Sequence, residues 1–195
     1  MDGFQKRTLK KRKAILDASL SLFNQYGYKN VTIAQISKQA HVSLDTIYNY
    51  FESKDNLKNK LLKQIVDEYC IFVENITNSN VPLTEKLEKM FLSKADFAKQ
   101  FSPQFLTEEL DDLNNLDLYG GQEKKQFLRD IIQKMIDQGK NEKIITVDAS
   151  SEAIAIYIEI FQYYITHNLA LTLQISRNEN LHKEIWTLFM NGFMK

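Results

Sequence analysis

The sequence of 195 residues is poor in residues that cross-link or interrupt a chain. It holds one cysteine, two prolines and six glycines. A single cysteine excludes an intrachain disulfide and favours a reducing compartment. Scarce proline and glycine favour long helices with few breaks. We interpret the thiol of Cys70, which lies in an apolar run, as buried and inert rather than redox-sensing.

The chain also lacks a long uninterrupted hydrophobic run. Its longest apolar stretch, residues 154–173, contains Glu159, Gln162, His167 and Asn168, which is typical of a buried helix rather than a membrane span. The basic N-terminus is not followed by the apolar segment of a signal peptide. We therefore expect a cytoplasmic protein with no membrane partner.

Enzyme signatures are absent from the sequence as well. It has no glycine-rich phosphate loop, no His-Glu-x-x-His and no Cys-x-x-Cys. Its histidines, His41, His167 and His182, are far apart and form no recognisable motif with the cysteine. The acidic pairs at 108–109 and 111–112 suggest a metal site, but we prefer solvated surface carboxylates. We expect no enzymatic activity, no cofactor and no bound metal.

Charge is distributed unevenly although the net charge is zero. Residues 1–64 hold twelve Lys and Arg against five Asp and Glu, a net charge of +7, whereas residues 65–195 carry −7. A basic first third joined to an acidic remainder is typical of a DNA-binding head on a body that does not bind DNA. Charge alone leaves open a basic solvated face without a partner.

Residues 32–54 have the pattern of a helix, a tight turn and a second helix. Thr32 is suited to cap the first helix, whose apolar residues recur at helical spacing. Ser43 is suited to cap the second helix, which places Ile47 and Phe51 one turn apart for the core. The other faces of this helix carry hydrogen-bonding side chains, which fits a DNA major groove. The alternative, an ordinary helical hairpin with surface tyrosines, agrees less well with the basic charge of this region.

Helical periodicity continues through the rest of the chain, without an internal repeat or a longer strand-like alternation. We therefore expect an all-α fold. Beyond the helix-turn-helix, the predicted helices span about residues 8–26, 54–75, 84–101, 103–110, 122–138, 151–172 and 178–194. The acidic segment 111–121 ends in Gly-Gly and is predicted to be a loop or a weak helix.

A specific set of residues occurs in order within about residues 10–60: Phe23-x-x-x-Gly27-Tyr28, Thr32, Ile36, Ala40, Val42-Ser43, Ile47-Tyr48, Tyr50-Phe51 and Ser53-Lys54 with Leu57. This set resembles the N-terminal domain of TetR-family transcriptional regulators. The resemblance implies a three-helix helix-turn-helix DNA-binding domain over residues 1–53. A helical ligand-binding and dimerisation domain would follow over residues 54–195, with about nine helices in all. It also implies a homodimer whose last two long helices form a four-helix interface with their mates.

The resemblance also implies a set of DNA contacts, mostly to phosphate. These contacts would be made by Thr32, Ser43, Thr46, Tyr48, Tyr50 and Lys54, and Asn49 is also placed to reach a base edge.

Two positions depart from the family pattern. His41 stands where the turn usually has glycine, and a left-handed backbone there costs about 1 kcal/mol. Asp45 would repel nearby phosphates, unless it caps the helix or accepts a hydrogen bond from a cytosine amino group. These departures affect the expected operator sequence rather than DNA binding itself.

The body is rich in aromatic residues, which is typical of a ligand cavity, although a packed core or a dimer seam accounts for any single one of them. We expect a small, mainly apolar effector, lipophilic or cationic, because the acidic body lacks clustered arginines. The candidate pocket residues are Tyr69, Phe72, Met90, Phe91, Phe105, Phe127, Tyr157 and Phe161. The candidate dimer-interface residues are Ile158, Ile165, Leu181, Ile185, Leu188 and Phe189.

The leading interpretation is a ligand-responsive transcriptional regulator. It would be a repressor that binds a palindromic operator in double-stranded DNA as a homodimer and is released by its effector. The alternative is a structural or nucleoid-associated DNA-binding protein of the same fold, with a protein partner and no small-molecule inducer. A third interpretation, an all-helical enzyme whose head is only a dimerisation hairpin, requires that sequence-specific DNA binding be absent.

Overall fold

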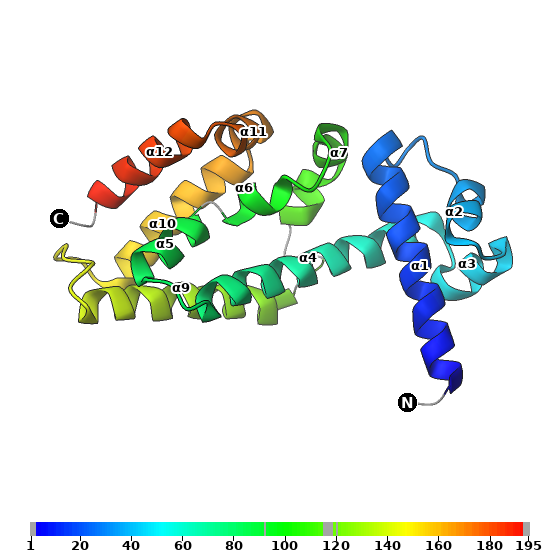
Figure 1. The fold of residues 1–195 in the computed structure, drawn as a ribbon, viewed down its shortest axis with the longest axis horizontal. Helices are drawn as coiled ribbons and strands as arrows, with labels where there is room; N and C mark the ends of the chain where they lie inside the picture. Colours follow the sequence, from blue (N-terminus) through cyan, green and yellow to red (C-terminus); the bar gives the residue numbers. More distant parts are fainter. Residues whose placement is uncertain (1–2, 92, 115–118, 120, 193–195) are drawn as a thin grey trace. The chain divides into compact units, whose positions relative to one another are not determined.

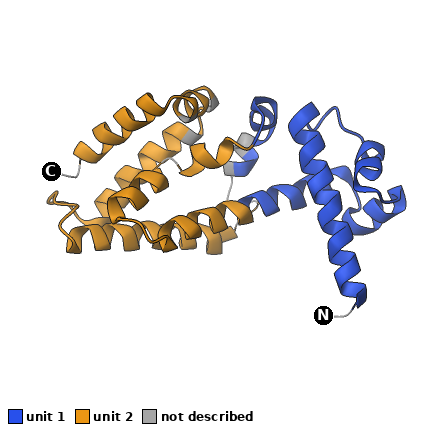
Figure 2. Ribbon diagram, viewed as in Figure 1, with its two compact units in different colours: residues 1–66, 101–113 blue, residues 67–100, 114–195 orange. Residues whose placement is uncertain are grey.

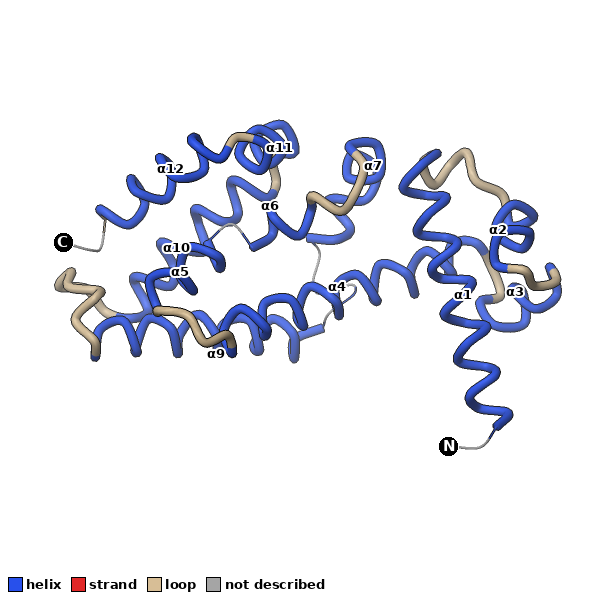
Figure 3. The backbone as a smooth tube through the Cα atoms, viewed as in Figure 1, coloured by secondary structure: helices blue, strands red, loops and turns tan. Residues whose placement is uncertain are grey.

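The computed structural model describes residues 3–91, 93–114, 119 and 121–192. These residues form eleven α-helices, and none of them lies in a β-strand (Figures 1 and 3). The prediction of an all-α fold is confirmed. No helix in the described part of the chain has the length and apolar character needed to cross a membrane.

Four helices form the first part of the chain (Figure 1). They are α1 (Gly3–Tyr26), α2 (Ile33–Ala40), α3 (Leu44–Phe51) and α4 (Lys54–Asn78). The first of these begins earlier than predicted, and α2 and α3 coincide with the predicted helix-turn-helix.

Seven further helices follow. They are α5 (Leu83–Phe91), α6 (Ser93–Ala98), α7 (Pro103–Asn114), α9 (Gly121–Asn141), α10 (Ser151–Thr166), α11 (Leu169–Arg177) and α12 (Glu179–Asn191). Of the acidic segment predicted to be a loop or a weak helix, residues 111–114 belong to α7. Most of its remainder lies outside the described residues.

Two predicted helices were wrong in their extent. The helix predicted over residues 84–101 corresponds to α5 and α6 and ends at Ala98, and the helix predicted over residues 151–172 ends at Thr166. The end at Thr166 has a local cause, because the side chain of Asn168 accepts a hydrogen bond from the Leu171 N–H at 3.0 Å and caps α11. An asparagine side chain that binds the backbone in this way starts a new helix instead of continuing the old one.

The chain divides into two compact units (Figure 2). Unit 1 comprises residues 1–66 and 101–113, and unit 2 comprises residues 67–100 and 114–195. The division falls inside α4, and most of α7 belongs to unit 1. The domain boundary predicted after residue 53 coincides with the end of the helix-turn-helix and stays a prediction for the extent of the DNA-binding domain.

Unit 1 is held together by a small apolar core. Ile15, Phe23, Ile36, Ile47 and Leu57 are at most 1% exposed in this core. They come from four different helices, so α1 and the start of α4 support the helix-turn-helix from behind. Burying side chains of this size contributes about 1.5–3 kcal/mol each.

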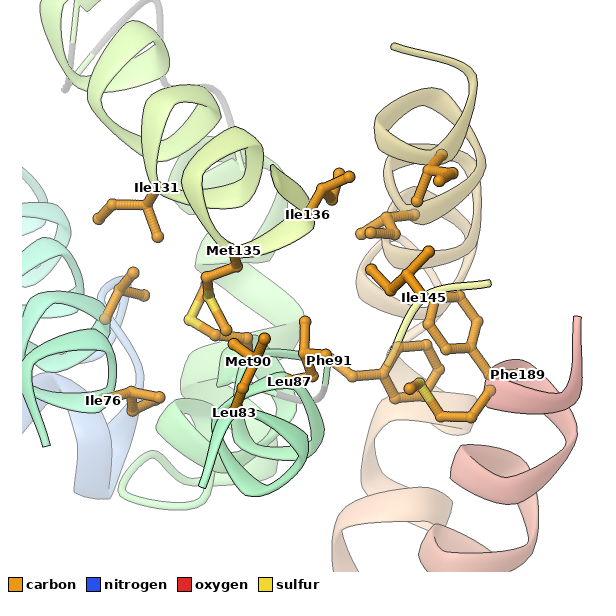
Figure 4. Close-up of a cluster of buried hydrophobic side chains, with 14 of the residues drawn as sticks. Ile76, Leu83, Leu87, Met90, Phe91, Ile131, Met135, Ile136, Ile145 and Phe189 are labelled. Atoms are coloured by element: carbon orange, nitrogen blue, oxygen red, sulfur yellow. The ribbon is translucent and has the colours of Figure 1, made fainter. Parts of the chain in front are cut away.

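Unit 2 contains a larger apolar core with an aromatic centre. The ring centroid of Phe91 lies 4.0 Å from that of Phe189, 5.1 Å from that of Phe161 and 5.5 Å from that of Trp186. Figure 4 shows Met90 of α5 beside Met135 of α9 in the same cluster. This core therefore joins α5, α9, α10 and α12 into one packed body.

Candidate functional sites

The helix-turn-helix is organised by local hydrogen bonds at its helix starts. Thr32 caps α2, because the Gln35 N–H donates to Thr32 Oγ1 at 3.3 Å and the Thr32 N–H donates to Gln35 Oε1 at 2.7 Å. Ser43 caps α3 by accepting a hydrogen bond from the Thr46 N–H at 3.2 Å. These bonds satisfy amide groups that the first turn of a helix leaves without intrahelical partners. Both predicted caps are confirmed.

The turn between the two helices has a left-handed residue where the sequence has histidine. His41 has φ 54° and ψ 45°. Two bonds hold the chain around it: the Ser37 hydroxyl donates to the Val42 carbonyl at 2.6 Å, and the Val42 N–H donates to the Ser37 carbonyl at 3.1 Å. The turn therefore keeps its geometry at the expected cost of about 1 kcal/mol for a non-glycine residue.

The outer face of α3 is polar and exposed. Asp45 and Asn49 are exposed, and 49% of the surface of Tyr48 is accessible, whereas Ile47 and Phe51 are buried. The side chains of Tyr48 and Asn49 are thus available to a partner outside the helix. Asp45 lies in the first turn of α3, where a carboxylate interacts favourably with the helix dipole.

Besides Thr32, the predicted DNA-contacting side chains of Ser43, Thr46 and Tyr50 have partners within unit 1. The hydroxyls of Ser43 and Thr46 lie 2.8 Å apart and share a hydrogen bond. The Arg12 guanidinium lies over the Tyr50 ring, with 5.7 Å between its central carbon and the ring centroid. This cation–π contact places a fixed positive charge of α1 beside α3.

Lys54 is held inside unit 1 by Tyr28. Its ammonium donates to the Tyr28 carbonyl at 2.6 Å and lies 4.1 Å from the centroid of the Tyr28 ring. Burial lowers the pKa of Lys54, although Asp55 and Glu108 counteract this effect. An ammonium held in this way is less free to reach a phosphate than an exposed lysine. We therefore revise the predicted role of Lys54 from phosphate contact to positioning the start of α4.

The segment around Tyr28 also contacts α7. The Tyr28 N–H donates to Glu108 Oε2 at 2.7 Å, and the Tyr28 hydroxyl forms a hydrogen bond with Asp55. Burial and the Asp55 carboxylate raise the pKa of Tyr28 to about 12. Gly27 permits this approach, because it has φ 79° and a Cβ at this position would collide with the Gln104 side chain.

A lysine and two carboxylates form an ion cluster between α4 and α7 of unit 1. Lys58 Nζ lies 3.0 Å from both Glu109 Oε2 and Asp112 Oδ2, and the Glu109 side chain is only 3% exposed. Burial disfavours the charge of Lys58, but the hydrogen bonds to the two carboxylates raise its pKa above the ordinary value.

The interpretation of this acidic stretch as solvated carboxylates is wrong for Glu109, because a lysine distant in sequence covers it. The side chain of Asp111, which belonged to the same stretch, lies outside the described residues. Where side chains are described, no group of three or more His, Cys, Asp or Glu could hold a metal ion.

Two cavities of very different size lie among the described residues of unit 2. The smaller has a volume of about 30 Å³ and lies in the apolar core beside Leu87, Phe91 and Trp186. It has room for about one water molecule and not for an effector. The larger has a volume of about 700 Å³ and is lined from α4, α5, α6, α9 and α10. This volume is in the range of small-molecule sites, which is about 300–1,000 Å³.

The predicted pocket residues are only partly brought together at these cavities. Tyr69 and Met90 line the larger cavity, and Met90 and Phe91 line the smaller one. Phe72, Phe127 and Phe161 are partly buried against the core of unit 2 instead.

Two other predicted pocket residues lie elsewhere. Tyr157 is 43% exposed and stacks on Phe189 with 5.3 Å between the ring centroids. Phe105 belongs to unit 1, where it is buried and stacks on Phe101. Neither lines either of the two cavities described above, and we withdraw both from the effector site.

Sequence reasoning missed the charged residues of the larger cavity. Lys94, Lys125 and Arg129 line it, together with carboxylates such as Glu159. In the sequence, a lysine that stands among other charged residues looks like a solvated surface residue. Nothing in the sequence around Lys94 separates it from a surface lysine.

The predicted dimer residues separate into buried and exposed groups. Ile158, Ile165 and Phe189 are at most 8% exposed and lie in the core of unit 2. Leu181 and Ile185 pack partly against the same core. Leu188 is 72% exposed and remains available to a partner. A side chain enclosed by its own chain offers little surface to a second copy, so we remove the buried three from the expected interface.

The same helices expose other apolar side chains, and we call those of α10 the α10 stripe. The α10 stripe consists of Ile156, Tyr157, Ile160, Tyr163 and Tyr164, which are between 43% and 66% exposed. Their spacing of three, four and seven residues places them along one side of the helix. Two of them, Ile156 and Tyr163, also line the larger cavity. Exposed apolar side chains gathered on one side of a helix favour an interaction site.

Comparison with known proteins places the helix-turn-helix in a recognised family. The sequence model for bacterial regulatory proteins of the tetR family matches residues 15–61. The chain is 26% identical over 92 residues to the HTH-type transcriptional regulator YhgD of Bacillus subtilis. That match covers 47% of this chain and 48% of YhgD, so the chain spans about half the length of this curated relative.

Two further similarities extend over nearly the whole chain. The HTH-type transcriptional regulator YvkB of Bacillus subtilis is 27% identical over 191 residues, which cover 92% of this chain and 95% of YvkB. The structure of the regulator FadR from Bacillus subtilis in complex with stearoyl-CoA aligns with a TM-score of 0.63 at 18% identity. It covers 93% of this chain and 98% of FadR, which shows that the two share a fold.

Proposed function

The chain belongs to the TetR family of transcriptional regulators, and from this premise we propose that it is a ligand-responsive repressor. It binds a palindromic operator as a homodimer in the cytoplasm and leaves the DNA when a small effector binds. It is not an enzyme in this proposal. The observation that carries the proposal is the capped α2–α3 pair, whose second helix exposes Tyr48 and Asn49 from the basic third of the chain.

Within this proposal, the exposed residues of α3 divide into two roles. Asn49 reads a base edge in the major groove, because an asparagine amide can donate and accept at the same adenine. Tyr48, with the capped start of α3 at Ser43 and Thr46, lies along the phosphates. Thr32 and Tyr50 complete the DNA-facing set, and the phosphate-side contacts determine register rather than sequence.

In a homodimer, the α3 helix of the second copy contacts the second half-site of the operator. Tyr157, Ile160 and Tyr164 of the α10 stripe and Leu188 of α12 are the apolar surface that supports an interface in unit 2, whereas Ile156 and Tyr163 line the larger cavity. A twofold dimer matches a palindromic operator whose half-sites lie about 34–36 Å apart.

The larger cavity of unit 2 supports the effector. FadR, which shares the fold, binds stearoyl-CoA in its solved structure. An effector in unit 2 releases DNA only if it binds the released conformation more tightly than the DNA-bound one. A coupling free energy of about 1–3 kcal/mol weakens DNA binding roughly 5- to 150-fold.

The proposal is tested by selecting DNA fragments from the source genome with the full-length protein and sequencing the bound pool. We expect enrichment of an inverted repeat. Asn49→Ala relaxes the preference at one position of each half-site, with a loss of about 1–3 kcal/mol of discrimination there. Asn141→Ala, an exposed asparagine of unit 2, is the matched control and leaves the preference unchanged.

Two outcomes would contradict this proposal. Tight binding without any shared sequence motif would favour the structural DNA-binding protein. Absence of DNA binding even at low salt, where phosphate contacts are strongest, would exclude both DNA-binding interpretations.

A further inference from the structure

The larger cavity of unit 2 has an apolar part and a charged part. Met90, Leu128 and Ile132 line it with aliphatic side chains from α5 and α9. Lys94 of α6 lines it with an ammonium group. A ligand that satisfies both parts must itself be amphipathic, because apolar atoms gain from burial and an ammonium requires a polar partner.

Lys94 differs from the other basic residues around it. Its side chain is only partly exposed where it lines the cavity, and desolvation lowers its pKa, with a smaller opposing effect of Glu159. Among the described residues, it has neither a hydrogen bond nor an ion pair. By contrast, Lys99 is paired with Asp96 at 2.7 Å, and Arg129 lies 3.9 Å from Glu159.

The carboxylate that acts on Lys94 is poorly placed to compensate it. The Glu159 side chain is 66% exposed, so that water screens its charge, and it is shared with Arg129. An ammonium that is partly desolvated and has no close partner is unfavourable, and an anion brought into the cavity would relieve this cost. The same anion would gain more from Lys94 than from an exposed lysine, because the cavity is less polar than water.

We propose that the effector of this protein is an organic acid, an apolar body with one ionised acid group that pairs with Lys94 in the cavity of unit 2. Its apolar body lies against Met90, Leu128 and Ile132. The assignment of this ligand as the effector rests on the proposed regulatory function. It replaces the lipophilic or cationic effector expected from the sequence, because an acidic body can still contain one desolvated lysine.

The test uses two fluorescent probes with the same aromatic body, anilinonaphthalene sulfonate and phenylnaphthylamine. The first carries an ionised acid group and the second has none. Both are titrated into the full chain, and the ratio of their affinities reports what the acid group contributes. Lys94→Met removes the ammonium and keeps the length of the side chain, Lys94→Arg keeps the charge, and Lys99→Met is the matched control at an exposed, paired lysine.

In the wild-type chain we expect the anionic probe to bind more tightly than the neutral one. Lys94→Met should lower the affinity ratio at least about tenfold, as expected for the loss of a charge-assisted hydrogen bond. Lys94→Arg should retain most of the ratio, and Lys99→Met should leave it unchanged.

Two results would overturn the assignment. An unchanged ratio in Lys94→Met would mean that the anionic probe does not pair with Lys94. An equal loss for both probes in Lys94→Met would mean that Lys94 only supports the shape of the cavity. No DNA is present in this measurement, so its failure is distinguishable from failure of the regulatory proposal, which is judged by operator selection alone.

Discussion

Lys58 is the residue on which the polar contacts between α4 and α7 in unit 1 depend. It lies 3.0 Å from both Glu109 and Asp112, and only 3% of the Glu109 side chain is exposed. A buried carboxylate is stable in its charged form only while a partner compensates it. Lys58 therefore stabilises unit 1 mainly because, without it, the buried Glu109 carboxylate would have no compensating charge. The attraction between the two groups contributes less.

Replacing Lys58 by methionine should destabilise unit 1 by about 3 kcal/mol near neutral pH, because Glu109 is left buried and unpaired. Burial then raises the pKa of Glu109 in the folded state above its value in the unfolded chain. A carboxyl group whose pKa is higher in the folded state than in the unfolded chain stabilises the fold at pH values below its pKa in the unfolded chain. This stabilisation is lost as the pH rises through the pKa of the folded state. Urea unfolding should therefore show a larger deficit at about pH 7.5 than at about pH 5.

The control for this prediction is the double variant Lys58→Met with Glu109→Gln. It carries no buried charge at either position, so most of the pH dependence should disappear. A deficit in Lys58→Met that is the same at both pH values would show that Glu109 is not the source of the effect.

At the scale of the element, α3 illustrates how a short helix depends on its cap. It has eight residues, and a helix of this length is marginal in isolation. The Ser43 side chain accepts the Thr46 N–H and also bonds its hydroxyl, so that the cap orders the end of α3 from which DNA contacts are expected.

Ser43→Ala should lower the free energy of unfolding by about 1 kcal/mol and should also weaken operator binding, because the first turn of α3 loses its cap. Ser150→Ala is the matched control, since Ser150 caps α10 by accepting from the Ala153 N–H at 3.1 Å. It should cost similar stability and leave operator binding unchanged. Urea titration and fluorescence anisotropy with operator DNA measure the two effects, and equal loss of DNA binding in both variants would contradict the prediction.

At the scale of the whole molecule, the proposed dimer depends on apolar surface that unit 2 leaves exposed. Leu188 and the α10 stripe are accessible, whereas Ile158, Ile165 and Phe189 are enclosed. A substitution at an enclosed residue would damage the fold before it affected association. At Leu188, by contrast, a substitution can weaken association of the two copies without damaging the fold of either one.

Leu188→Glu should weaken dimerisation at least about tenfold while leaving the helix content unchanged, because the carboxylate is solvated in the monomer and desolvated in the interface. Sedimentation equilibrium measures the dissociation constant, and circular dichroism the helix content. Leu9→Glu, at an exposed leucine of α1, introduces the same charge change in unit 1 and should have no effect on association. An undisturbed dimer in Leu188→Glu would move the interface away from this part of α12.

Features that depend on neighbours in sequence were determined by the sequence itself. The caps at Thr32 and Ser43, the left-handed turn at His41 and the core positions Ile36, Ile47 and Phe51 follow from side chains within a few residues of one another. Capping bonds and helical periodicity act at this short range, so they can be recognised before the fold is known.

Features that depend on distant segments were decided only by the tertiary structure. Glu109 is buried because Lys58 reaches it from another helix, and Phe105 joins unit 1 although it resembles the other aromatic residues of the body. On α10, Ile158 is buried and Ile160 is exposed because α5, α9 and α12 form the core on one side of this helix. Lys94 was indistinguishable from a surface lysine in the sequence, because desolvation is a property of the packing around a side chain and not of the residue.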